Sequence, residues 1–108
     1  MSKQYSYTKE KLAATIEALA TDPDDVRKRL SKSYILFCAL TENDFPVELQ
    51  EDWKWIMKEL NKYDPRYNIK GEIIKGSVEN TMRRVKNSTG VKIAERIFSL
   101  YKKINNDF

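Results

Sequence analysis

The fold is decided by residues 45–63, FPVELQEDWKWIMKELNKY. The large apolar residues of this stretch recur at the spacing of one helical face: Leu49, Trp53, Ile56, Met57 and Leu60. Pro46 fits the first helical position, where its missing N–H costs nothing, and it disfavours the α conformation at Phe45. Burying each large side chain contributes about 1.5 to 3 kcal/mol. The stretch therefore predicts an amphipathic helix that starts at Pro46 and forms the centre of the fold.

The composition is that of one small globular domain. The chain has 108 residues, of which 33% are charged and 41% hydrophobic, and it has only three Gly and three Pro, which favours long helices over strands and turns. Cys38 is the single cysteine, so no internal disulfide forms and we expect a reducing, cytoplasmic location. No apolar run approaches the roughly 20 residues of a membrane span, so we expect no membrane partner.

Apolar spacing in the rest of the chain predicts further helices. We expect residues 1–8 to form a polar N-terminal arm and residues 9–108 to form a single helical domain. The additional helices are expected over 9–20, from Pro23 to about Leu40 with Asp22 as N-cap, over 77–86 with a start as early as Gly71, and from an N-cap at Ser88 onward. The fold class is thus all-α, a compact single-domain bundle of about five helices.

The segment 34–40, YILFCAL, is apolar on every side. A helix of that kind is normally surrounded by other elements, so we expect this segment to be the most buried of the chain. Cys38 inside it is expected to be a small core residue and not a reactive thiol. The helices around 23–40 and 46–63 and the last helix are expected to supply most of the core.

The sequence gives no support for an enzyme. It has no His, which removes the commonest general base and metal ligand. Glu48, Glu51 and Asp52 could hold a cation, but an acidic first turn is also what a helix dipole favours, and we prefer that interpretation. Residues 71–77 resemble a phosphate loop only superficially, because Ser77 stands where the motif requires Lys. We predict no catalytic residue, cofactor, metal or small-molecule substrate.

Trp55 is the leading candidate for a partner contact. It lies about 200° around the helix from Trp53, on the side opposite the apolar face, and it is surrounded by charged residues. A tryptophan in such a setting is typical of an interface hot spot, with Glu51, Lys58 and Lys62 beside it. The alternative is that Tyr5, Tyr7 or residues 65–76 cover it within the molecule. The leading function is therefore a non-catalytic small helical protein that binds a protein partner or associates with itself.

The alternative function is a nucleic-acid-binding regulator that uses basic helix faces. The net charge is +4, and because residues 41–52 contribute −5, the remainder of the chain carries +9. The candidate contacts to nucleic acid or to an acidic partner are Arg83, Arg84, Lys92, Arg96 and Lys103. The last three form a row that could also dock the acidic stretch of a second copy. Solvated helix faces would explain the same charges without any partner.

The start of the central helix, DFPVEL over residues 44–49, is similar to that of small uncharacterised bacterial helical proteins. This resemblance leads to no named family with a known activity, and no fold, cofactor or site residue is carried over from it.

Overall fold

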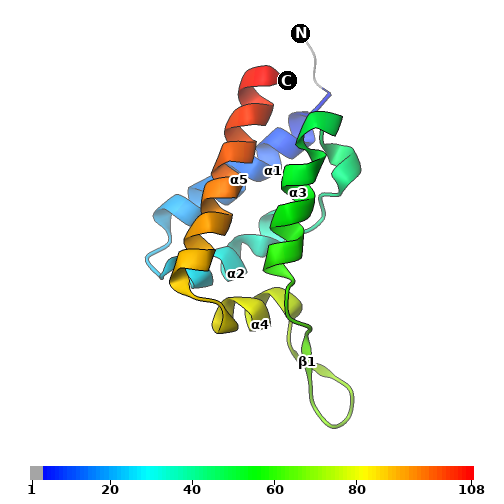
Figure 1. The fold of residues 1–108 in the computed structure, drawn as a ribbon, viewed down its shortest axis with the longest axis vertical. Coiled ribbons are helices and arrows are strands. Elements are labelled where there is room, and N and C mark those ends of the chain that lie inside the picture. Colours follow the sequence, from blue (N-terminus) through cyan, green and yellow to red (C-terminus); the bar gives the residue numbers. More distant parts are fainter. Residues whose placement is uncertain (1–3) are drawn as a thin grey trace.

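A computed structural model describes residues 4–108 and shows within them five α-helices and one small antiparallel sheet (Figure 1). The helices are α1 (Ser6–Thr21), α2 (Val26–Phe37), α3 (Val47–Leu60), α4 (Ser77–Arg84) and α5 (Asn87–Asp107). A single 3-10 turn, η1 (Glu42–Asp44), precedes α3, and the strands are β1 (Arg66–Tyr67) and β2 (Ile73–Lys75). The predicted compact all-α bundle of about five helices is confirmed. No helix among the described residues is both long and apolar enough to cross a membrane.

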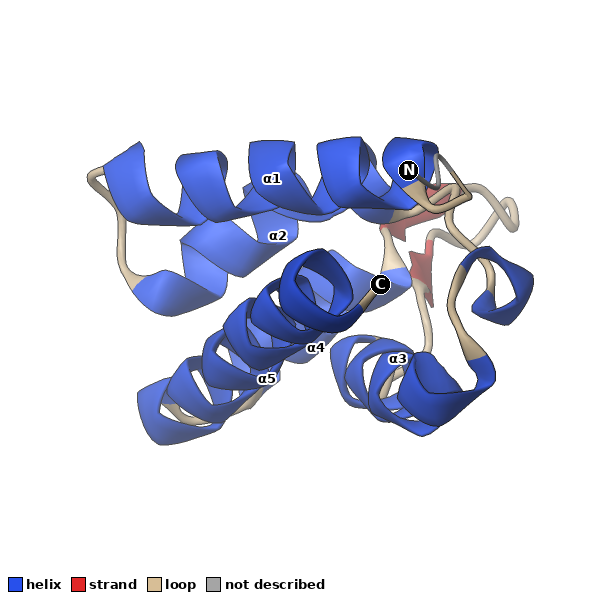
Figure 2. Ribbon diagram, turned by 90° about the horizontal axis from the view of Figure 1, so that it is seen from above, coloured by secondary structure: helices blue, strands red, loops and turns tan. Residues whose placement is uncertain are grey.

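The helices form an elongated molecule with the sheet at one end. Helices α1 and α2 lie side by side, and α5 packs against α1, α2 and α3 (Figure 2). The short helix α4 packs against α2 and α3, and the loop formed by β1 and β2 projects from the molecule beyond it (Figure 1). The longest dimension is 53 Å. At the other end, the ring of Tyr5 packs edge-on against Phe108 with 6.1 Å between the ring centroids.

The core is centred on α3 and α5. The predicted face of α3 is buried at Leu49, Trp53, Ile56 and Leu60, whereas Met57 is half-buried at its margin. The face of α5 is buried at Ile93, Ile97, Leu100 and Ile104. The ring of Trp53 stacks on Phe45 at 4.9 Å and meets Phe37 edge-on at 6.0 Å, which joins α2, α3 and the turn between them. These contacts position the amphipathic helices that the sequence predicts.

The start of α2 differs from the prediction. Asp25, and not Asp22, is the N-cap, and its carboxylate accepts hydrogen bonds from the N–H groups of Arg27 and Lys28 at 2.9 and 3.3 Å. Asp22 instead follows the end of α1 and accepts a hydrogen bond from the N–H of Asp24 at 2.9 Å. Either carboxylate could cap a helix N-terminus. Asp25 is the N-cap because it directly precedes Val26, the first buried residue of α2.

The expectation that residues 34–40 are the most buried segment is wrong. Helix α2 ends at Phe37, and only Phe37 and Leu40 of this segment are buried. Ile35 is 78% exposed, and Cys38 is exposed and therefore not a core residue. The reason is that α2 lies on the outside of the bundle, so that one face packs inward and the opposite face meets solvent. In a segment that is apolar on every side, the sequence does not show which face packs against the core.

Three further helix boundaries differ from the prediction: the start of α1, the end of α4 and the start of α5. Helix α1 begins at Ser6, so the last residues of the expected 1–8 arm are helical, while residues 1–3 lie outside the described part. Thr8 in this region is buried and its hydroxyl donates to the carbonyl of Asp44 at 2.7 Å. Helix α5 begins at Asn87 and not after Ser88, and α4 ends at Arg84 and not at residue 86.

Gly90 explains why the break expected around residues 87–90 is the first turn of α5. A Cβ atom at this position would lie 3.1 Å from the Cγ1 atom of Val26 and 3.2 Å from the Cγ atom of Arg27. The missing side chain therefore lets the first turn of α5 approach the first turn of α2 closely. Close helix packing, and not a turn, accounts for this glycine.

Helix α4 fixes the point where the chain leaves α3, through a set of side chains that we call the clamp: Ser77, Asn80 and Thr81. The Ser77 hydroxyl donates to the carbonyl of Tyr63 at 2.8 Å, and the Asn80 amide donates to the carbonyl of Asp64 at 2.8 Å. The Thr81 hydroxyl oxygen accepts the N–H of Tyr63 at 2.9 Å. Asn80 and Thr81 are buried, so these hydrogen bonds satisfy polar groups inside the fold. The helix start predicted as early as Gly71 is wrong, because residues 73–75 form a strand.

Thr81→Val tests the clamp. The substitution keeps the shape of the buried Thr81 side chain but leaves the partly buried N–H of Tyr63 without this acceptor, so we expect a loss of about 1 to 3 kcal/mol in the free energy of unfolding. Urea denaturation followed by circular dichroism measures it. Thr21→Val is the matched control, because the Thr21 hydroxyl is exposed on α1, and we expect a change within about 0.5 kcal/mol there. Equal effects at the two positions would contradict the clamp.

Candidate interaction surfaces

The segment 66–75, which we call the hairpin, exposes large apolar side chains to solvent. The exposed fractions are 104% for Ile69, 62% for Ile73, 59% for Ile74 and 55% for Tyr67. Large exposed apolar residues elsewhere are scattered over the helices: Tyr7, Ile35, Val47, Val91 and Phe98. Isolated exposed residues of that kind are ordinary, but a concentration of them on a projecting segment marks a contact surface. The sequence analysis missed this surface, although the isoleucines between Gly71 and Gly76 were a visible signal.

The tip of the hairpin is ordered by Asn68. The side-chain oxygen of Asn68 accepts the N–H groups of Lys70 and Glu72 at 2.9 and 3.0 Å, and its side-chain nitrogen donates to the Glu72 carboxylate at 3.0 Å. The backbone adds an N–H bond from Asn68 to the carbonyl of Glu72 at 2.9 Å. Gly71 supplies the positive φ of +80° that this turn needs. The tip thus holds Ile69 in a defined position in solvent.

The two strands of the hairpin have little other support. Arg66 pairs with Lys75 and Tyr67 pairs with Ile73, and the register shift between these pairs leaves Ile74 as an extra residue, a β-bulge. Within the described chain the sheet has only these two strands, so the outer edge of each strand lacks a strand neighbour. An isolated two-stranded hairpin is marginally stable in water. The order of this one therefore depends on the Asn68 turn and on the clamp.

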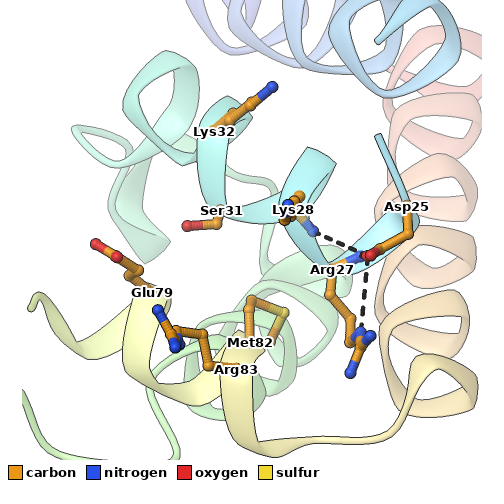
Figure 3. A pocket seen from close by; sticks show the side chains of 8 residues that line it. All are labelled: Asp25, Arg27, Lys28, Ser31, Lys32, Glu79, Met82 and Arg83. Carbon is orange, nitrogen blue, oxygen red and sulfur yellow. Dashed lines mark hydrogen bonds and ion pairs between the residues drawn. The ribbon is translucent and has the colours of Figure 1, made fainter. Parts of the chain in front are cut away.

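A second surface is a groove between α2 and α4, which we call the basic groove (Figure 3). Its volume is about 630 Å³, and its lining residues are Asp25, Arg27, Lys28, Ser31, Lys32, Glu79, Met82 and Arg83. Basic residues that are far apart in the sequence meet here because α2 packs against α4. Lys28 and Arg83 are exposed, whereas the guanidinium of Arg27 donates to the carbonyl of Val85 at 3.2 Å.

Acidic groups offset part of the positive charge of the basic groove. The N–H groups of Lys28 and Arg27 hydrogen-bond to the Asp25 carboxylate and lower its pKa, so this group is negative at neutral pH. Lys32 forms ion pairs with Asp24 and Asp22, and the hydrogen bond that it donates to the Asp24 carboxylate is the main reason that the pKa of Lys32 is raised. Lys28 and Arg83 are therefore the cations of this groove best placed to meet an anionic partner.

Trp55 is half-buried, and its cover comes from α5. The guanidinium carbon of Arg96 lies 4.3 Å from the centroid of the Trp55 ring, a cation–π contact, and the ring packs against the core. Arg96 also donates to the carboxylate of Asp52 at 3.2 Å, and Lys103 donates to the same carboxylate at 3.0 Å. The Asp52 side chain is only 19% exposed. Arg96 and Lys103, which the sequence suggested for an acidic partner, are therefore engaged within the chain.

The other predicted contact residues do not gather at one place. Glu51 forms an exposed ion pair with Lys54 at 3.6 Å, Lys58 is exposed on α3, and Lys62 follows the end of that helix. Lys92 is exposed on α5, and Arg83 lines the basic groove. Arg84 stacks on the ring of Tyr63 at 5.3 Å, and its Nε donates to Asn80 at 3.3 Å, so it supports the clamp.

A smaller groove, which we call the base groove, lies where the hairpin joins the helices. Its volume is about 250 Å³, and its lining residues are Ser31, Tyr34, Asn61, Gly76, Ser77, Val78 and Glu79. Ile35 lies on the same side of α2 as Ser31, because residues four apart share a helical face. The exposed carboxylate of Glu79 is part of the lining, whereas Ile35, which follows Tyr34 on α2 and is 78% exposed, is not.

Among residues 4–108 there is no cluster of three or more His, Cys, Asp or Glu side chains that could hold a metal ion. Comparisons of the chain with protein-family profiles, with curated proteins and with solved structures found no match. Function must therefore be argued from the surfaces described above.

Proposed function

We propose that this chain is a non-catalytic binding protein that acts by contact with another protein, and that the hairpin is the contact surface. The observation that carries the proposal is the exposure of Tyr67, Ile69, Ile73 and Ile74 on one projecting segment. The proposal moves the contact away from Trp55, whose ring is already covered by Arg96. It keeps the class of function that the sequence suggests.

The energetics of the hairpin support a binding role. Burying these four side chains in an interface would contribute roughly 1.5 to 3 kcal/mol each. Association costs about 4 to 15 kcal/mol in lost freedom, and further ordering of the contact surface adds to that cost. The Asn68 turn and the clamp already order the hairpin, so little additional entropy is lost on binding. The gain from four apolar side chains exceeds only the lower part of that cost, so binding also requires a partner surface that is ordered beforehand.

The charges around the hairpin support selectivity. Arg66, Lys70 and Lys75 alternate with the apolar side chains, and Glu72 is the acidic residue among them. Charged groups at the rim of an apolar contact contribute more to the association rate and to the choice of partner than to affinity. A partner surface for the hairpin would therefore combine an apolar depression with charges opposite to these.

Ile69→Ser tests this function. Affinity capture from an extract of the source cells, together with sedimentation of the purified chain, measures binding to other proteins and to itself. Removing the tip side chain should reduce the bound protein about tenfold or more, as expected for an interface hot spot. Val47→Ser is the matched control, since it makes a comparable change at a site on α3 that is 78% exposed and lies outside the hairpin, and it should retain the partner. Equal binding by wild type and Ile69→Ser, with unchanged unfolding curves, would contradict the proposal.

A second candidate function is nucleic-acid binding through the basic groove. It is favoured by one observation, that the packing of α2 on α4 brings the exposed cations Lys28 and Arg83 to the same groove. Phosphate contacts of this kind need no sequence-specific geometry and weaken steeply with salt.

Retention on a duplex DNA column as a function of salt tests this candidate. The combined variant Lys28→Glu, Arg83→Glu should elute at lower salt than wild type, with the salt dependence reduced by about one unit of slope for each lost phosphate contact. Lys58→Glu combined with Lys92→Glu makes the same change in net charge at exposed positions outside the groove. If both double variants elute together, the groove is not the binding surface.

A further inference from the structure

We infer that the protein partner of the hairpin is a second copy of this chain, in a symmetric dimer in which the tip of each hairpin occupies the base groove of the other. This inference rests on the proposed function of the hairpin as a protein-contact surface. It is carried by three features of the chain: the shape of the two contact regions, the length of the hairpin, and the order of charges along it.

The base groove is a suitable receptor for the tip. Its volume of about 250 Å³ accommodates an aliphatic side chain, and its walls include Tyr34 and Val78. Ile35, which follows the lining residue Tyr34 on α2, is 78% exposed and leaves one more apolar side chain of α2 without cover. Ile69 is the matching group, an isoleucine held fully in solvent at the tip. The contact would cover the most exposed apolar residues at this end of the molecule.

The length of the hairpin allows both tips to bind at once. The base groove includes Gly76 and Ser77, so it lies at the root of the hairpin, and the tip lies about five residues away at roughly 3.3 Å per residue. When two hairpins lie side by side in opposite directions, the tip of each reaches the root of the other. A twofold axis between them makes the two contacts identical and closes the assembly as a dimer.

The order of charges favours the antiparallel arrangement. The tip carries Lys70 and Glu72, and the root carries Glu79, Arg66 and Lys75. Opposite directions bring Lys70 near the partner's Glu79, and bring Glu72 near the partner's Arg66 and the partner's Lys75. A parallel arrangement would instead place Lys70 near the partner's Lys70 and Glu72 near the partner's Glu72, which is repulsive. Each charge of the tip therefore has an opposite charge at the partner's root, and Glu72 offsets the repulsion between Lys70 and the partner's Arg66 and the partner's Lys75.

The other acidic region of the chain is a poorer receptor. The start of α3 offers Glu48 and Glu51, together with Val47, which is 78% exposed. These residues complement the positive charges of the hairpin, but none of them lines the basic groove or the base groove. The base groove combines charge with an apolar recess.

A charge exchange within one chain tests the dimer. Sedimentation velocity of the wild-type chain from micromolar to millimolar concentration, in reductant because Cys38 is exposed, should show a monomer–dimer equilibrium. Lys70→Glu and Glu79→Lys should each weaken dimerisation about tenfold or more, because each places like charges at both symmetric contacts. The two substitutions combined in one chain recreate the pair with reversed signs and should restore the wild-type dissociation constant within about threefold. Lys58→Glu is the control for net charge, and it should leave the equilibrium unchanged.

The result that overturns the inference is a wild-type chain that stays monomeric over this range, or a combined variant no stronger than the weaker single variant. The proposed function would survive that result if Ile69→Ser still lost a different protein partner. Cosedimentation of the monomer with vesicles of phosphatidylglycerol and phosphatidylcholine, lost in Ile69→Ser, would also overturn the inference, because the hairpin would then take a lipid surface.

Discussion

The structure depends on the hydrogen bonds by which α4 holds the backbone of Tyr63 and Asp64. Buried polar side chains are stable only when they are paired, and Asn80 and Thr81 find their partners in these two residues. The same bonds fix the direction in which the chain leaves α3, and Ser77 adds a bond from the first turn of α4. A segment anchored in this way in the core can project into solvent as an ordered hairpin. Without the clamp, two strands of two and three residues would have little to hold them.

Ion pairs between α3 and α5 help to hold the bundle together. Asp52 on α3 receives both Arg96 and Lys103 from α5, and Arg96 also covers Trp55. These charged groups are already paired within the chain, so they are less available to bind a partner. The hairpin differs, because its isoleucines are exposed to solvent, whereas the apolar side chains of the core are buried between the helices. Arg96 and Lys103 are paired within the bundle, whereas the apolar side chains of the hairpin are uncovered. This difference is the physical basis for assigning the binding role to the hairpin.

The parts of the fold that could be predicted are those with a strong helical period. The faces of α3 and α5 follow from Leu49 to Leu60 and from Ile93 to Ile104, because regular burial leaves a regular pattern. The segment 34–40 lacks such a pattern and was assigned to the interior wrongly. The hairpin could not be predicted because its order comes from a turn around Asn68 and from contacts such as Tyr63 with Thr81, eighteen residues apart. Trp55 is predicted to face away from the core, whereas the structure has it half-buried against the core under Arg96, a tertiary contact without a sequence signal.

The central claim is that a clamped, ordered hairpin presents its apolar side chains to solvent. NMR spin relaxation of the backbone amides over residues 66–75 tests this claim most directly. The claim predicts order parameters near those of α3 and α4, about 0.8 or higher, at dilute concentration. Values below about 0.6 across the hairpin, with the helices rigid, would contradict it, because a disordered segment could not present Ile69 in a fixed position.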